Sequence, residues 1–373
     1  MNNRHEVTEQ PDEVTEQPDA RRDLVVIGAS AGGLPALRTL VSQLPESFPA
    51  AILVVVHIGT QPSILPSLLT AWGRLPAVHA EDGSEIRPGL IQVAPPDHHL
   101  LLEEEGIRLS RGPKEHHSRP AIDPLFRSAA ICCGPRVIGV ILSGHLDDGT
   151  AGLQAIKACG GLVIVQEPRD AQVASMPLSV LRHVEVDHCI PTAGMPRLLN
   201  ALVAEPAPLG KFPAPDALRS EHAVTLSTSA TDAMRNLQAF SKPSTHSCPD
   251  CGGVLWEVDA AKPPRFRCHT GHAFTFLTLA DSMKEATEEA LQTAIRALQE
   301  QAILRRRAAE MKRAAEELAE ATTIDADADR LEEQMRLLMQ ISEHSGLRSL
   351  EDPRPADTVP PDSGDEVPGA TQT

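Results

Sequence analysis

Short apolar runs without polar alternation are the clearest pattern in the first part of the chain. They occur at Leu24–Ile27, Ala51–Val56, Val137–Leu142 and Leu162–Val165. Runs of this kind are typical of strands buried on both faces of a sheet. Stretches with helical spacing, such as residues 34–44, lie between them. The alternation predicts an α/β fold with a doubly wound, mostly parallel sheet.

The segment Glu85–Leu102 has a different residue pattern, because its apolar runs are shorter and are separated by Pro-Gly and Pro-Pro-Asp turns. We expect an antiparallel hairpin at one edge of the sheet. The pattern of a compact domain ends near Ala204, which assigns residues 22–204 to one domain.

The flanking segments are less regular. Residues 1–21 contain a tandem acidic repeat, and residues 349–373 are acidic and rich in proline, so both are expected to be disordered tails. Residues 205–247 are rich in proline, serine and alanine and are interpreted as a linker.

Long helices are predicted for residues 275–348, with an interruption at Asp325–Asp329. Their apolar positions follow a 4-3-4 spacing that favours a coiled coil, hence a homo-oligomer or a docking arm for a partner. The basic run Arg305–Arg307 is expected to be a solvated face. The spaced apolar residues are Leu291, Ile295, Leu298 and Ala302.

Composition narrows the functional classes. The chain has 373 residues, 41% of them hydrophobic, and a formal net charge of −17. Such an acidic surface repels phosphate backbones and anionic lipids, which argues against nucleic acid and membrane partners. The N-terminus lacks an apolar signal core, and no apolar run approaches the roughly 18 residues of a membrane span. The cytoplasm is therefore the expected location.

Residues 248–274 predict a small zinc-ribbon-like module. Cys248 and Cys251 are separated by two residues around a turn, and Cys268 follows after sixteen more. With His272 they complete a Cys₃His set suited to a tetrahedral structural zinc, and His269 is the competing fourth ligand. No cofactor is expected for catalysis.

The turn after the first predicted strand carries candidate chemistry. Gly28-Ala-Ser30-Ala-Gly32 fits a nucleophile elbow, in which a serine hydroxyl is exposed between a strand and a helix. The same turn also resembles a degenerate dinucleotide-binding loop, or it is a tight turn without further function.

Two further residues favour the hydrolase interpretation. His57 ends the strand 51–56, and Asp148 follows the strand 137–142. A histidine and a carboxylate at neighbouring strand ends can serve as the base and its orienting partner for Ser30. Moreover, no acidic residue ends the second strand, where ribose recognition would require one.

Several segments together resemble the methylesterase domain of CheB-type chemotaxis proteins. The likeness runs from about Arg22 to Val203, with the serine, histidine and aspartate in the order of the family. The segments that carry it are Asp23–Gly33, Val54–His57, Pro88–Asp97, His117–Phe126 and Val140–Gly149.

The resemblance implies a protein-glutamate methylesterase that hydrolyses glutamyl methyl esters on chemoreceptor signalling helices and in many members also deamidates glutamines. The resemblance implies that Ser30 attacks the side-chain carbonyl, that His57 transfers the proton and that Asp148 orients His57. The N–H groups near Ala31 and His145 are the expected oxyanion site. Methylated chemoreceptors or related signalling proteins, and the chemotaxis methyltransferase, are the implied partners.

Three departures from the family pattern are visible. Ala31 replaces the usual threonine, Ser143-Gly-His-Leu146 replaces Thr-Gly-Met-Gly, and a receiver domain ahead of the methylesterase segment is not expected. A non-enzymatic signalling scaffold that acts through the metal module and helices is the alternative function.

Overall fold

Seven strands, all parallel, form the central sheet in the order β3-β4-β2-β1-β7-β8-β9. The four strands predicted from apolar runs are all present as β1, β2, β7 and β8. Their burial on both faces explains why these runs show no polar alternation. The strands are β1 (Leu24–Ala29), β2 (Ala51–Val56), β3 (Ala77–His79), β4 (Ile91–Val93), β7 (Val137–Ile141), β8 (Leu162–Gln166) and β9 (His188–Ile190).

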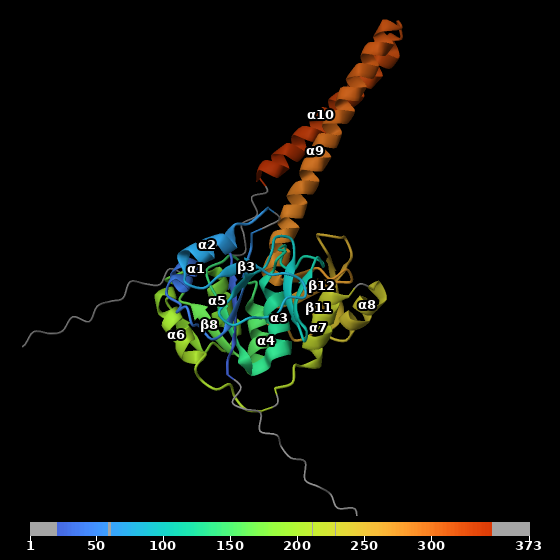
Figure 1. Ribbon diagram of the computed structural model, residues 1–373. Helices are drawn as coiled ribbons and strands as arrows, with labels where there is room; N and C mark the ends of the chain where they lie inside the picture. The colour runs from blue at the N-terminus through green and yellow to red at the C-terminus, as the bar shows by residue number, and fades with distance from the viewer. Residues whose placement is uncertain (1–20, 59–60, 211, 228, 345–373) are drawn as a thin grey trace, which may run out of the picture. The chain divides into compact units, whose positions relative to one another are not determined.

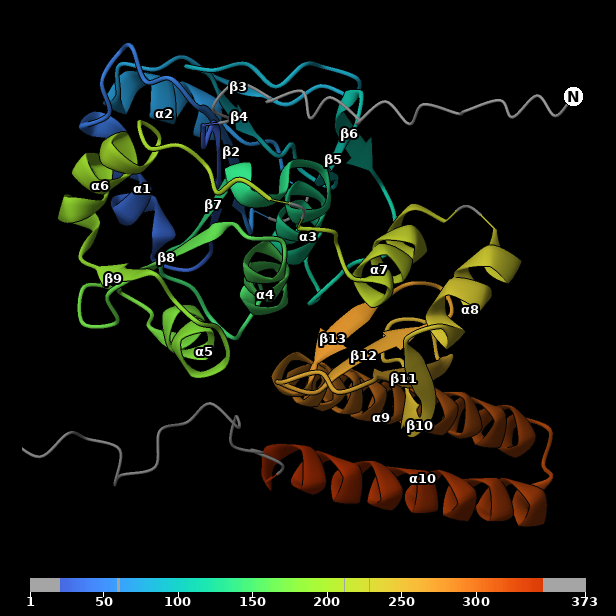
Figure 2. The same ribbon diagram turned by 90° about the horizontal axis from the view of Figure 1, so that it is seen from below.

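Helices cover both faces of this sheet, as the two views in Figures 1 and 2 show. One hydrophobic cluster packs α1, α2 and α6 against the sheet, and the other packs α3, α4 and α5. The helices are α1 (Gly33–Ser42), α2 (Leu65–Trp72), α3 (Ile122–Cys133), α4 (Thr150–Ala158), α5 (Ser175–His183) and α6 (Met195–Leu202), with short 3-10 turns at Gly134–Arg136 and Thr192–Gly194.

The expected antiparallel hairpin is present, but it forms a sheet of its own. Strands β5 (His99–Glu103) and β6 (Gly106–Ser110) pair only with each other. The preceding segment supplies β4, which joins the main sheet in parallel.

This computed structural model describes residues 21–58, 61–210, 212–227 and 229–344. The chain divides into two compact units, Met1–Leu279 and Ala280–Thr373. The predicted tails fall outside the described residues, except for Arg21. Within the described part of the chain, every helix is too short or too polar to serve as a membrane span.

The segment expected to be a linker is largely structured. It holds α7 (Asp216–Leu226), α8 (Ala230–Gln238) and β10 (Ser241–Ser247). In Figure 2, α7 lies between the helices α3 and α4 and a second sheet.

The second sheet contains the cysteine pairs. It is antiparallel, with the order β10-β11-β12-β13. Its further strands are β11 (Val254–Val258), β12 (Arg265–Cys268) and β13 (Ala273–Thr275). This sheet belongs to the first compact unit, together with the parallel sheet.

Two long helices end the described chain, α9 (Phe276–Ala314) and α10 (Leu318–His344). The break lies at residues 315–317, not at Asp325–Asp329, which is helical. Arginines of α9 neutralise these acidic residues: Arg305 pairs with Asp327 at 2.9 Å, and Arg306 pairs with Asp325 at 3.3 Å. The predicted interruption is therefore wrong, and Arg305 and Arg306 are ion-pair partners of α10 rather than a purely solvated face.

Candidate active site and metal cluster

Ser30 lies in the turn between β1 and α1. Its N–H donates to the carbonyl of Ser143 at 3.0 Å, which fixes the turn against the neighbouring loop. Gly32 adopts a φ of 71°, and a Cβ there would come within 2.7 Å of the Ser143 hydroxyl. Glycine is therefore required at this position, and the turn leaves Ser30 half-buried.

His57 follows β2, the neighbour of β1 in the sheet. Its Nδ1 lies 3.1 Å from the Ser30 hydroxyl, and its Nε2 lies 2.8 Å from Oδ2 of Asp148. Because β1, β2 and β7 are parallel neighbours, their carboxyl ends bring these three side chains together. The three residues predicted from the sequence thus form one hydrogen-bonded line.

Asp148 lies in the loop between β7 and α4 and is 1% exposed. Its carboxylate accepts the backbone N–H of Ile122 at 2.7 Å and that of Asp123 at 3.0 Å. These are the first residues of α3, so the carboxylate binds at a helix N-terminus, where free N–H groups and the helix dipole favour negative charge.

The electrostatic surroundings keep Asp148 ionised. Burial alone would raise the pKa of its carboxyl, but the charge of His116 and the hydrogen bond from His57 lower that pKa to about 2. A carboxylate in this position can hold Nε2–H of His57, which leaves Nδ1 to accept the hydroxyl proton of Ser30. The arrangement is suited to nucleophilic attack by Ser30.

The candidate oxyanion residues lie on both sides of Ser30. Ala31 follows it directly and is exposed, and His145 is exposed in the loop after β7. Gly144, which directly precedes His145, is in close contact with Ser30, because a Cβ at position 144 would lie 2.9 Å from the Ser30 Cβ. Ser143 ties the two loops together by donating to the carbonyl of Ala31 at 2.8 Å.

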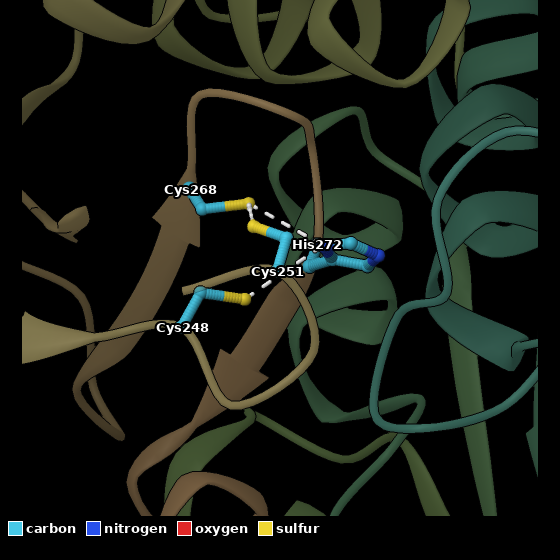
Figure 3. Close-up of side chains that lie close together, drawn as sticks. All are labelled: Cys248, Cys251, Cys268 and His272. Atoms are coloured by element: carbon cyan, nitrogen blue, oxygen red, sulfur yellow. Dashed lines mark hydrogen bonds between the residues drawn. The ribbon is translucent and has the colours of Figure 1, made fainter. Parts of the chain in front are cut away.

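The four predicted metal ligands also meet. Ligand atoms of Cys248, Cys251, Cys268 and His272 all lie within 4.8 Å of one another, and Figure 3 shows the three sulfurs and the imidazole converging. The Cys251–Cys268 sulfur distance is 3.7 Å, and His272 Nδ1 lies 3.5 Å from the Cys268 sulfur. A tetrahedral zinc requires about 3.8 Å and about 3.6 Å for these distances, from its usual bond lengths.

The backbone around the cysteines has the required tight turn. Gly252 donates to the carbonyl of Cys248 at 2.8 Å with a φ of 71°, which curls both thiols to one side. His272, and not His269, lies with the sulfurs. The Nε2 of His272 faces Asp250 at 3.8 Å, an arrangement that orients Nδ1 toward a metal.

Sequence reasoning missed a buried histidine behind Asp148. His116 Nε2 lies 2.9 Å from Oδ2 of Asp123 and 3.8 Å from Oδ1 of Asp148. Burial alone would lower the pKa of His116, but the carboxylates of Asp148 and Asp123 raise it to about 9. Nothing in the local sequence signals this role, because the partners are set by tertiary contacts.

A buried ion network was also missed. Glu115 pairs with Arg127 of α3 and with Arg267 of β12, each at 2.8 Å. Glu221 of α7 pairs with Arg265 at 2.7 Å and with Arg267 at 3.2 Å. Burial alone would raise the pKa of Glu115, but Arg127 and Arg267 hold it well below its usual range. The network links the parallel sheet domain, α7 and the four-stranded sheet.

Comparisons with known proteins concern the first part of the chain. Residues 25–199 match the family described as CheB methylesterase. A protein from Leptospira interrogans called a putative protein-glutamate methylesterase/protein-glutamine glutaminase is 39% identical over 174 residues, which are 45% of this chain and 88% of that protein. A Myxococcus xanthus protein-glutamate methylesterase/protein-glutamine glutaminase is 38% identical, over 48% of this chain and 53% of its own length.

A solved structure is also similar. The crystal structure of the Thermotoga maritima CheB methylesterase catalytic domain is 36% identical, covering 48% of this chain and 98% of that one with a TM-score of 0.47. The residues matched to the family contain Ser30, His57 and Asp148, while Cys248, Cys251, Cys268 and His272 lie beyond them. Since nearly nine-tenths of the Leptospira protein aligns with it, this chain belongs to the CheB methylesterase family.

Proposed function

We propose that this protein is a protein-glutamate methylesterase with Ser30, His57 and Asp148 as its catalytic triad. The observation that carries the proposal is the hydrogen-bonded line from Asp148 through His57 to Ser30. The names of the relatives support a glutamyl methyl ester of a protein as the substrate class. The proposed target is such an ester on a chemoreceptor signalling helix or a related signalling protein.

The reaction has two halves. The Ser30 Oγ attacks the ester carbonyl while Nδ1 of His57 takes the hydroxyl proton, and Asp148 stabilises the resulting imidazolium. The tetrahedral intermediate expels methoxide, which takes that proton from His57 and leaves as methanol. A water molecule, deprotonated by His57, then attacks the acyl-serine, and the products are a free glutamate side chain and a regenerated serine.

The oxyanion of each tetrahedral intermediate is stabilised by N–H groups near Ala31 and His145, two exposed residues of the loops that meet at Ser30. With a glutamine side chain the same steps release ammonia, which gives the glutaminase activity in the names of the relatives. Donors aimed at the developing charge contribute about 10²–10³-fold to turnover in such sites.

Methanol release tests the proposal. The purified protein is incubated with methylated cytoplasmic fragments of a chemoreceptor, with Ser30→Ala as the control. Release by the unsubstituted protein and none by Ser30→Ala is the expected result. No release, together with an unreactive Ser30, would overturn it in favour of a non-enzymatic signalling scaffold.

We further propose one structural zinc ion per chain, held by Cys248, Cys251, Cys268 and His272. The sulfur and nitrogen spacings support this donor set, and a Cys₃His site leaves no open position for substrate. Elemental analysis should give one zinc per chain. A zinc content that Cys268→Ser leaves unchanged would contradict the assignment.

The proposed partners extend to a second copy of the chain or the chemotaxis methyltransferase, bound through α9 and α10. Several large apolar side chains of these helices are exposed, among them Ile303, Leu304 and Met311. The proposed compartment is the cytoplasm, which agrees with the free thiols of the four cysteines outside the proposed zinc site, Cys132, Cys133, Cys159 and Cys189. Light scattering of the chain with and without residues 280–373 tests self-association.

A further inference from the structure

The four-stranded sheet reaches the back of the proposed triad through His116. This histidine lies in the loop between β6 and α3, and its side chain is nearly fully buried beneath the N-terminus of α3. Its Nε2–H donates to Asp123 at 2.9 Å and lies 3.8 Å from the Asp148 oxygen that faces away from His57. A cation at this place fixes both the charge and the orientation of Asp148.

The fold alone does not secure His116 in this position, because its backbone is strained. His116 has a φ of 51° and His117 a φ of 60°, a left-handed conformation that is unfavourable for residues other than glycine. The strain is offset by a contact from β13: the N–H of His116 donates to the carbonyl of Ala273 at 2.8 Å. The Nδ1 of His116 also lies 3.4 Å from the Thr278 hydroxyl.

A second contact reaches the neighbour of Asp148. The hydroxyl of Thr275, the last residue of β13, donates to Oδ1 of Asp147 at 2.7 Å. The other Asp147 oxygen is buried without a partner among the described residues. Thr275 therefore binds the loop that carries Asp148 through the residue next to Asp148.

Both contacts begin next to the metal cluster. Ala273 follows the ligand His272 directly, and the N–H of Cys268 donates to the carbonyl of His272 at 3.0 Å. Cys268 ends β12 and His272 directly precedes β13, and these two strands pair from Arg265↔Thr275 to Arg267↔Ala273. The position of β13 thus depends on the same four side chains that converge in Figure 3.

We propose that His116 is a positioning residue for Asp148 and that the metal-binding sheet, through Ala273 and Thr275, holds the triad in its reactive geometry, so that loss of the metal lowers the reactivity of Ser30. The inference rests on the proposed function. The metal would then regulate activity, because removal of zinc or oxidation of its thiolate ligands lowers the reactivity of Ser30 without a chemical change at the serine itself.

The test uses a fluorophosphonate probe on the full-length chain, because the probe reports the activation of Ser30 whatever the natural substrate is. The rate of inactivation at saturating probe, kinact, and the half-saturating concentration, KI, are measured separately. His116→Gln and Thr275→Val should lower kinact by at least about tenfold with little change in KI. Thr275→Ser keeps the hydroxyl and should retain kinact, as should the matched control His183→Gln on an exposed part of α5.

Chelation of the metal should lower kinact in the same way, and added zinc should restore it, with metal content and near-UV circular dichroism followed in parallel. If Thr275→Val, His116→Gln and the metal-free chain all keep the kinact of the unsubstituted protein, the coupling is overturned while the serine mechanism stands. If Ser30 of the zinc-loaded protein does not react at all, the proposed function itself fails.

Discussion

His57 faces Ser30 with Nδ1 and Asp148 with Nε2, the reverse of the usual assignment of these two nitrogens in a Ser-His-Asp triad. The tautomer required for catalysis therefore carries its proton on Nε2. Only an acceptor at position 148 stabilises that tautomer.

Substitution of Asp148 separates charge from hydrogen bonding. Asp148→Asn can keep one oxygen toward His57 and Ile122, and loses one bond from Asp123 N–H. Asp148→Ala leaves both buried N–H groups unsatisfied, at about 1–3 kcal/mol each. Both should lower turnover by about 10²-fold or more, because neither stabilises the His57 cation. The melting temperature of Asp148→Asn should be higher than that of Asp148→Ala. Equal melting temperatures would contradict the observed hydrogen bonds from the N-terminus of α3.

Ser30→Ala should abolish turnover and leave stability unchanged. The hydroxyl is half-buried at a turn, and its described partner is His57, so that no buried group becomes unpaired in the core. A loss of several orders of magnitude in kcat with an unchanged melting temperature is expected, since triad members act as a unit. His57→Ala is the matched comparison, and its residual turnover should be as low as that of Ser30→Ala. Full turnover by Ser30→Ala would exclude Ser30 as the nucleophile.

Glu115→Ala should destabilise the first compact unit strongly. Its carboxylate is 1% exposed and pairs with both Arg127 and Arg267, so its removal leaves two buried guanidinium groups short of charge. Breaking such a pair costs about 3–5 kcal/mol. Urea unfolding measures the loss, with the exposed Glu103→Ala as control. A loss of unfolding free energy no larger than that of Glu103→Ala would mean that water replaces the ion pairs of Glu115 with Arg127 and Arg267.

The pH dependence of stability should carry the signature of His116. Its pKa is raised from 6.5 to about 9 in the folded chain, because the carboxylates of Asp148 and Asp123 outweigh the effect of burial. The folded state therefore binds the proton more tightly, and this contribution is complete below about pH 6.5. It is lost as the pH rises to 9 and above. Melting temperatures measured between pH 6 and 10 should fall less steeply for His116→Gln than for the unsubstituted chain.

The sequence predicted the centre of the fold well, because strands buried on both faces leave a local signature. β1, β2, β7 and β8 were all predicted, and so was the convergence of Ser30, His57 and Asp148, which follows from parallel strands ending at one edge. The convergence of the four candidate metal ligands is also predicted from the sequence, because their spacing is local.

What escaped prediction depends on contacts between distant segments. α7 has a weak helical signal and is stabilised by Glu221 binding to Arg265 and Arg267. Asp325–Asp329 was expected to break a helix, because the arginines that neutralise it lie about twenty residues earlier in the chain. His116 is one of fifteen histidines, and only the tertiary structure places it behind Asp148.

The ion network around Glu115 has a consequence for how the chain can be divided. The likeness to known methylesterases stops near residue 199, and a chain shortened to residues 21–204 would match the catalytic part of those relatives. Here that cut would discard Glu221, Arg265 and Arg267 and strand Glu115 and Arg127 at a newly exposed surface. The smallest independently stable hydrolase should instead extend to about residue 279. The end of the sequence likeness and the end of the stable folding unit therefore fall at different residues.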